Sequence, residues 1–323
     1  MRAGYHQSNY IIPSILICFF FAGSALAIDQ APEPRQVFAK MMLAIDSLNY
    51  QGTVALYKNG KLDTMNYVHA VNQGQYQERL TALNTPLREI IRTSDKVVCK
   101  FSQTNDIVID HRPIRRSFFM DLPNKLDNVD SNYDFILRGE ESIARLPTRV
   151  LLIHPKDDLR YTRKIWVDQN SYLPLRFELI DAAGIALEQA IFIDIEIKDA
   201  LSFVEIANLD DSNVKHIHQL EKLDFSDSKF VVDTLPPGFY QVFFTHRTLS
   251  DPDKLVEHLL LSDGFSSVSV YFEQGDDNSL ESHLTNAGAI NSYARQIGDY
   301  RLTVLGEVPI KTVQLIAEGI KLR

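Results

Sequence analysis

The sequence has very little cysteine. Only Cys18 and Cys99 occur among its 323 residues, and Cys18 falls in an N-terminal segment that we expect to be cleaved off. With one cysteine left, the mature chain can form no internal disulfide bond. Cys99 lies in the apolar run KVVCKF, where an unpaired cysteine usually behaves as a small buried side chain and not as a catalytic thiol. Disulfide-stapled folds and thiol chemistry are therefore both disfavoured.

The sequence also lacks the short motifs that mark common active sites. It contains no Gly-x-Ser-x-Gly, His-Glu-x-x-His or Cys-x-x-Cys motif and no glycine-rich phosphate loop. His216 and His218 could reach one metal ion, but no third ligand lies in register with them. For a hydrolase, Asp168 and His69 would be the candidate residues. We predict instead that the protein is not an enzyme and has no cofactor and no metal site.

Basic residues are outnumbered. The chain has 33 Lys and Arg against 42 Asp and Glu, with a formal net charge of −9. A nucleic-acid backbone or an anionic membrane surface favours a basic protein face. The balance argues against both, and we expect no nucleic-acid partner.

The N-terminus has the pattern of an export signal. Arg2 precedes an apolar run at residues 11–21, and the small-residue ending Ala25-Leu26-Ala27 follows. This order predicts a signal peptide, residues 1–27, with cleavage before Ile28. The apolar run is too short for a transmembrane helix, which needs about 20 residues. We therefore expect a soluble, exported mature chain.

The rest of the chain is dominated by short strands. Residues 34–48 predict one amphipathic helix, because apolar side chains recur at helical spacing. Residues 50–199 then read as about ten short strands with tight turns, and a single antiparallel sheet of that size must curl or close. After a polar segment, the remaining strands and a helix that opens at Pro309 predict a smaller second domain. The expected fold class is α+β, with domains at 28–206 and 223–323 and a linker at 207–222.

One hairpin within this region suggests an apolar cavity. In residues 163–181, Leu175, Phe177 and Leu179 point to one side of their strand, and Ile165 and Val167 of the preceding strand share an apolar face. Trp166 and Asp168 fall on the opposite, mixed outer face. A curved sheet with few helices against it leaves apolar surface uncovered. We predict that these five apolar residues line a lipid-binding cavity, together with Phe118 and Phe119 of a lid-like insertion at 112–133.

The order of several short motifs resembles the MucB/RseB family of sigma-E factor regulatory proteins. The matching stretches are SLNYQG, YVHA, LREII, YDFIL, WVDQNSYLPLRFELID, LPPGF, LSDGFSSVSVYFE and VLGEVPIKTVQLIAEGIK. The resemblance implies an unclosed antiparallel β-barrel with helices on its concave side, like the lipoprotein carriers LolA and LolB, followed by a small α+β domain. It supplies no catalytic residues.

The resemblance also implies a function. Such proteins act in the periplasm, where they bind the periplasmic domain of an inner-membrane anti-sigma factor of the RseA/MucA type. Bound there, they protect it from regulated proteolysis and hold the envelope stress response down. The implied lipid signal is a lipoprotein acyl chain or lipopolysaccharide. A periplasmic lipid or lipoprotein carrier is the alternative function. The sequence is compatible with both a monomer and a homo-oligomer.

Overall fold

The computed structural model describes residues 32–84, 87–101, 107–110, 122–123, 129, 131–204, 214–217, 223–248, 255–274 and 283–323, together with residues 1 and 4. Its first element is α1 (Pro34–Ser47), which begins with a proline in the first turn and ends where the Leu48 N–H bonds to the Ala44 carbonyl at 3.0 Å. Proline suits this position because its missing N–H would have no partner there. The predicted helix is confirmed.

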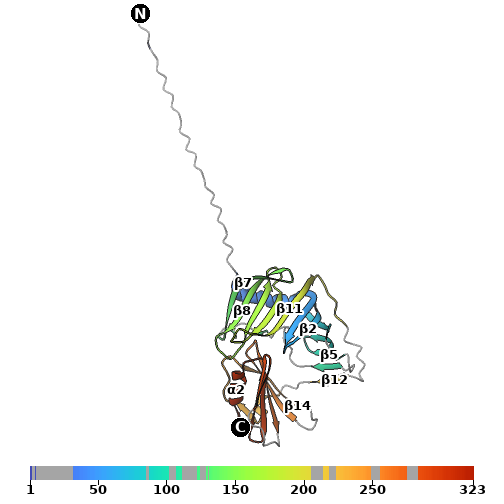
Figure 1. The fold of residues 1–323 in the computed structure, drawn as a ribbon, viewed down its shortest axis with the longest axis vertical. Coiled ribbons are helices and arrows are strands. Elements are labelled where there is room, and N and C mark those ends of the chain that lie inside the picture. Colours follow the sequence, from blue (N-terminus) through green and yellow to red (C-terminus); the bar gives the residue numbers. More distant parts are fainter. Residues whose placement is uncertain are drawn as a thin grey trace. The chain divides into compact units, whose positions relative to one another are not determined.

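A large sheet follows α1. Its strands, listed in chain order, are β1 (Asn49–Lys58), β2 (Lys61–Asn72), β3 (Gln75–Ala82), β4 (Leu87–Thr93), β5 (Val97–Phe101), β6 (Ile107–Asp110), β7 (Tyr133–Ile143), β8 (Leu146–Pro155), β9 (Thr162–Asp168), β10 (Pro174–Ile180), β11 (Ala186–Lys198) and β12 (Val214–Ile217). Their order across the sheet is β12-β6-β5-β4-β3-β2-β1-β11-β10-β9-β8-β7. Since β7 and β12 are separate edges, the sheet is unclosed, as predicted (Figure 1).

Two features of this sheet are not apparent from local patterns. β1 pairs with β11, which lies far along the chain, and this pairing joins the two halves of the sheet. β12 lies inside the segment predicted as a linker and pairs with β6 in parallel, whereas the other described neighbours in this sheet are antiparallel.

A smaller sheet forms the C-terminal part. Its strands are β14 (Tyr240–Thr248), β15 (Leu255–Ser262), β16 (Ser267–Gln274), β17 (His283–Ala287), β18 (Ile290–Ile297) and β19 (Tyr300–Gly306), in the order β14-β15-β16-β19-β18-β17. The helix α2 (Ile310–Glu318) packs Val313, Ile316 and Ala317 into the core of this sheet. A 3-10 turn, η3 (Phe225–Asp227), and the strand pair β13 (Phe230–Val232) and β20 (Ile320–Leu322) complete it. The predicted α+β fold class is therefore confirmed.

The two sheets belong to one compact unit, Glu33–Arg323. A single hydrophobic cluster contains side chains of α1, of β7 to β11 and of the C-terminal sheet region, including Phe265 and Ala289. The junction between the sheets is therefore part of the core.

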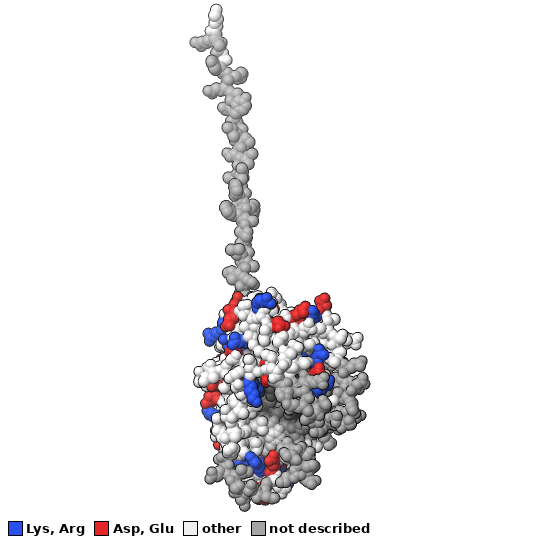
Figure 2. Space-filling view, turned by 45° about the vertical axis from the view of Figure 1, so that its right-hand side comes forward, with Lys and Arg blue, Asp and Glu red and all other residues white. Residues whose placement is uncertain are grey.

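The surface shows charges of both signs. On the face drawn in Figure 2, acidic and basic side chains of the described residues are interspersed and neither sign forms a continuous field. None of the helices in the described part of the chain has the length and apolar character needed to cross a bilayer.

Candidate functional site

The helix α1 covers one face of the large sheet. Its buried side chains Val37, Phe38, Met41 and Ile45 share a cluster with residues of β8 to β11, and Figure 1 shows α1 running across these strands. Burial of each such side chain contributes roughly 1.5–3 kcal/mol. The helix is therefore held firmly on the sheet.

Four of the predicted cavity-lining residues lie under this helix. Ile165, Val167, Phe177 and Leu179 belong to the cluster that contains the α1 side chains, and none is more than 6% exposed. Phe177 pairs directly with Ile165 across β10 and β9, so the face that the alternation pattern predicts is the face that α1 covers.

Leu175 behaves differently from the other four residues. The pairing of β10 with β9 shifts register between Pro174 and Arg176, which inserts one extra residue at Leu175. A β-bulge of this kind redirects a side chain. Leu175 is fully buried in a second cluster, which includes Tyr50 and Trp166. Phe118 and Phe119 lie outside the described residues.

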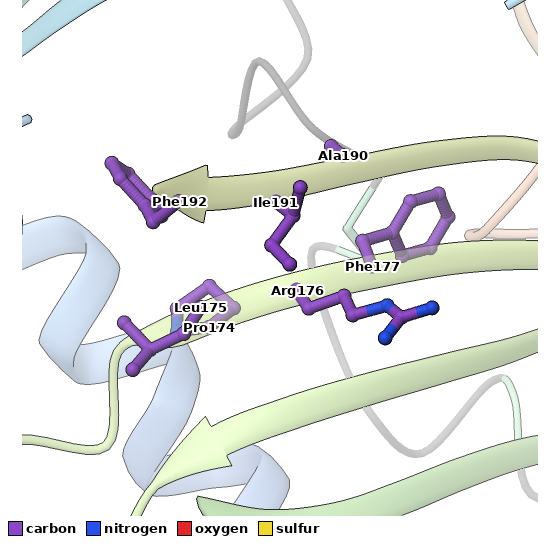
Figure 3. A pocket seen from close by; sticks show the side chains of 7 residues that line it. All are labelled: Pro174, Leu175, Arg176, Phe177, Ala190, Ile191 and Phe192. Carbon is purple, nitrogen blue, oxygen red and sulfur yellow. The ribbon is translucent and has the colours of Figure 1, made fainter. Parts of the chain in front are cut away.

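The cavity between the described side chains of β10 and β11 is small. A cavity of about 10 Å³ is lined by residues of β10 and β11, namely Pro174, Leu175, Arg176, Phe177, Ala190, Ile191 and Phe192 (Figure 3). That is about the room a single water molecule needs. This cavity, between described residues of β10 and β11, is too small for a lipid chain.

The mixed outer face of the hairpin is less exposed to solvent than its sequence suggests. Trp166 is 1% exposed: it packs in the apolar cluster of Tyr50 and Leu175, and Lys164 Nζ and the Arg176 guanidinium carbon each lie 4.3 Å from its ring centroid. Long basic side chains often cover apolar surface in this way while their charged ends stay near water. Trp166 is thus a packing residue under two cations.

Asp168 and His69, the hydrolase candidates, lie apart. Asp168 Oδ2 accepts hydrogen bonds from the Ser171 N–H and hydroxyl, both at 2.7 Å, which caps the turn after β9. His69 Nδ1 lies 2.8 Å from the Leu48 carbonyl oxygen, on β2. Three strands, β1, β11 and β10, separate β2 from β9 in the sheet. The fold does not bring these two residues together.

A second element completes the covered face, and it comes from the C-terminal sheet. The turn between β15 and β16, residues 262–266, inserts Phe265 against α1 and β7. The Phe265 ring centroid lies 5.7 Å from that of Phe38, 5.0 Å from that of Tyr133 and 6.3 Å from that of Phe135. Phe265 is only 1% exposed, so the C-terminal sheet contributes a core residue to the N-terminal one.

The shape of this turn depends on Gly264. Its φ is 98°, a value that L side chains rarely adopt, and a Cβ there would lie 3.0 Å from a Val129 methyl and 3.2 Å from Pro123. Glycine alone meets both requirements without strain. The Asp263-Gly264 pair therefore closes the β15–β16 hairpin and also directs Phe265 into the core of the large sheet.

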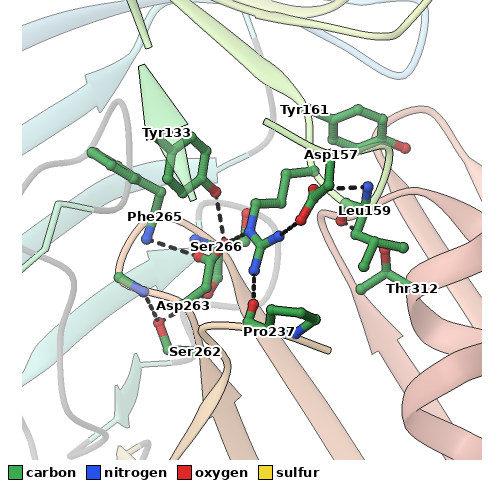
Figure 4. Close-up of polar contacts among 12 residues, drawn as sticks. Tyr133, Asp157, Leu159, Tyr161, Pro237, Ser262, Asp263, Phe265, Ser266 and Thr312 are labelled. Atoms are coloured by element: carbon green, nitrogen blue, oxygen red, sulfur yellow. Dashed lines mark hydrogen bonds and ion pairs between the residues drawn. The ribbon is translucent and has the colours of Figure 1, made fainter. Parts of the chain in front are cut away.

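A buried ionic network fixes the turn (Figure 4). Asp263 Oδ2 accepts from Tyr133 Oη and from Arg160 Nε, each at 2.6 Å, and its Oδ1 accepts from the N–H groups of Phe265 and Ser266 at 3.0 and 2.7 Å. The side chains of Asp263 and Arg160 have no exposed surface. Arg160 also donates to Asp157 and to the Pro237 carbonyl. Each charge in this junction has a partner, as burial requires.

Arg163 holds the turn from β9. Its Nη2 donates to the Phe265 carbonyl at 2.6 Å and to Ser266 Oγ at 2.8 Å. Burial, together with the negative charge of Asp263, raises the pKa of the Tyr133 hydroxyl well above its ordinary value. Tyr133 therefore stays a hydrogen-bond donor to Asp263.

Further polar contacts surround this network. Asn291 Nδ2 donates to Tyr161 Oη at 2.9 Å, and Thr312 Oγ1 donates to the Leu159 carbonyl at 2.6 Å. At the surface, Lys311 Nζ lies 2.6 Å from Asp158 Oδ2. The segment between β8 and β9 thus contacts β18, α2 and the 262–266 turn.

Local sequence patterns do not place Asp263 beside Arg160 and Arg163. Asp263 precedes Gly264, a pair typical of an ordinary tight turn. One local signal is present, since Arg160 and Arg163 lie three positions apart just before the apolar residues of β9, and a buried arginine needs hydrogen-bond acceptors. No His, Cys, Asp or Glu group suited to a metal occurs in the described residues, and His218 lies outside them.

Comparisons with known proteins cover both sheets. The model of the MucB/RseB N-terminal domain matches residues 33–216, and that of the MucB/RseB C-terminal domain matches residues 224–321. The sigma-E factor regulatory protein RseB of Salmonella typhimurium is 29% identical over 329 residues, which covers 98% of each chain. The sigma factor AlgU regulatory protein MucB of Pseudomonas aeruginosa is 27% identical over 312 residues, 93% of this chain and 95% of the relative.

A solved structure has a similar fold. MucB in complex with MucA(peri) superimposes with a TM-score of 0.71 at 22% identity, covering 90% of this chain and 99% of that one. The likeness extends over both sheets.

Proposed function

This chain belongs to the MucB/RseB family, and from that premise we propose that it binds the periplasmic domain of an inner-membrane anti-sigma factor. The observation that carries the proposal is the match of both family domains along the chain, with relatives named as sigma factor regulators aligned over nearly their whole length. The solved complex of MucB with MucA(peri) supports a partner of this type. Binding would shield the anti-sigma factor from proteolysis and restrain the envelope stress response.

Calorimetry tests this proposal directly. The mature chain, titrated with the purified periplasmic domain of the anti-sigma factor from the same genome, is expected to give saturable binding. It should also slow cleavage of that domain by its activating protease. Absence of a binding signal at several temperatures would refute the proposal. The binding enthalpy changes with temperature when apolar surface is buried, so it can be zero at one temperature but not at all of them.

We also propose the domain organisation and location that this function needs. Residues 28–206 are the lipid-sensing domain, 207–222 the linker, whose strand β12 also pairs with the large sheet, and 223–323 the smaller domain. The chain reaches the periplasm after cleavage before Ile28. The partner domain named in the solved complex is periplasmic, which supports the location. N-terminal sequencing of the chain from a periplasmic extract tests the cleavage site.

Lipid sensing is the finer part of the proposal. Its support is the apolar face under α1, where Ile165, Val167, Phe177 and Leu179 are buried, with Leu175 nearby. We propose that a lipoprotein acyl chain or the lipid part of lipopolysaccharide binds this face. Transfer of an acylated lipoprotein onward to an acceptor would favour the carrier alternative instead.

The variant Phe177→Asp separates the lipid response from binding of the anti-sigma factor domain. An unpaired charge in an apolar site costs several kcal/mol, so this variant should lose its response to lipid while partner binding weakens less. Lipid response is measured as the fall in partner affinity when lipid is added. Phe177→Leu, which keeps the site apolar, is the matched control. Equal loss of both activities in Phe177→Asp would indicate misfolding and count against a lipid site at this position.

A further inference from the structure

Phe265 belongs to the C-terminal sheet, yet its ring is buried among side chains of α1 and β7. Its contacts with Phe38, Tyr133 and Phe135 place it in the same cluster as Ile165 and Phe177. The cover of the large sheet therefore has two parts, namely α1 and one side chain delivered by the turn at residues 262–266.

These two parts are held in different ways. α1 is attached through five buried side chains, those of Val37, Phe38, Met41, Ala44 and Ile45, and nothing in water replaces such apolar contacts. The turn contributes one apolar ring and several polar contacts. Asp263, Arg160 and Arg163 would regain water as partners if the turn withdrew, which offsets much of the loss.

The Phe265 ring fills the place between α1 and β7: it is 1% exposed, and its centroid lies 5.7 Å from that of Phe38 and 5.0 Å from that of Tyr133. An acyl chain can occupy that place only after the ring has left it. Since the turn is the part more easily replaced by water, it is the part that an apolar ligand displaces.

We propose that the turn at residues 262–266 is a plug, and that a long-chain acyl group binds between α1 and β7 in the place of the Phe265 ring. Acyl binding and closure of the junction then exclude each other, so the ligand opens the contact between the two sheets. The inference rests on the proposed lipid response and specifies its site and its moving part.

Removal of the ring tests the competition. Phe265→Ala in the mature chain should bind a fluorescent long-chain fatty acid about tenfold more tightly than the unsubstituted chain, because the closed state no longer competes. Phe244→Ala removes another buried phenylalanine of the C-terminal sheet, packed on Phe225 away from α1, and should leave the affinity unchanged. Equal affinity of Phe265→Ala and the unsubstituted chain would overturn the plug.

A labelling experiment keeps Phe265 in place, so it does not depend on how that variant folds. Ser266 is 1% exposed and accepts a hydrogen bond from Arg163. In a Cys99→Ser background, Ser266→Cys should react with a thiol reagent at least about tenfold faster when the fatty acid is bound, because reaction requires local opening. Ser228→Cys, buried in the same domain beside Glu257, should not accelerate.

The outcomes separate this inference from the proposed function. If the fatty acid binds but neither the labelling rate at position 266 nor the effect of Phe265→Ala appears, the plug is wrong and the lipid response stands. If no variant binds the fatty acid, both the plug and the lipid response are wrong. Binding of the anti-sigma factor domain is measured separately by calorimetry and is decided on its own.

Discussion

Asp263 links the two sheets through a buried ionic network. Its carboxylate accepts hydrogen bonds from Tyr133, from Arg160 and from two N–H groups of its own turn. Asp263→Asn leaves the Arg160 guanidinium buried without its full counter-charge. Breaking a buried ion pair costs about 3–5 kcal/mol, and urea unfolding should show a loss of that size in the free energy of unfolding.

Asp158→Asn is the control for Asp263→Asn. Asp158 and its partner Lys311 are both exposed, and an exposed ion pair contributes little because water competes for both charges. Its removal should leave the free energy of unfolding nearly unchanged. If the two variants lost similar amounts, the buried network would not be a main support of the junction.

The pairing of strand β1 with strand β11 joins the two halves of the large sheet. A Cβ at Gly52 of β1 would lie 2.2 Å from the backbone oxygen of Asp194 in β11, so Gly52→Ala must push the two strands apart. We expect a loss of about 1–3 kcal/mol in the free energy of unfolding, as for other overpacked sites, measured by urea titration.

The neighbouring residue supplies the comparison for Gly52→Ala. Gln51 lies on the same strand and reaches Glu196 only through an exposed contact of 3.5 Å. Gln51→Ala should change stability by no more than about 0.5 kcal/mol. A tolerated Gly52→Ala would mean that β1 and β11 can separate without cost to the sheet.

The whole molecule should unfold as one unit. Phe265 and Ala289 share a cluster with α1 and the large sheet, so neither sheet can lose its structure without exposing core of the other. We expect one calorimetric transition for the mature chain. Phe265→Asp, which places a charge in that shared cluster, should split it into two. Two separate transitions in the unsubstituted chain would show that the junction does not couple the sheets.

Local patterns were informative wherever neighbouring residues set the structure. The helical spacing of Val37, Phe38, Met41 and Ile45 predicts α1 and its buried face, and the alternation at Phe177 and Leu179 predicts the side of β10 that faces the helix. Leu175 breaks this alternation because a bulge inserts it. Trp166 is buried because it packs in the apolar cluster that contains Leu175 and because two cations from neighbouring positions lie on its ring.

The sequence by itself determined the fold class, the helix on the large sheet and the family, because periodicity and motif order are properties of local stretches. The tertiary structure alone decided that β1 meets β11, and that Asp263 and Phe265 of one sheet complete the other. Those contacts join residues more than a hundred positions apart. No periodicity encodes them, since they follow from the burial of charge and apolar surface where the two sheets meet.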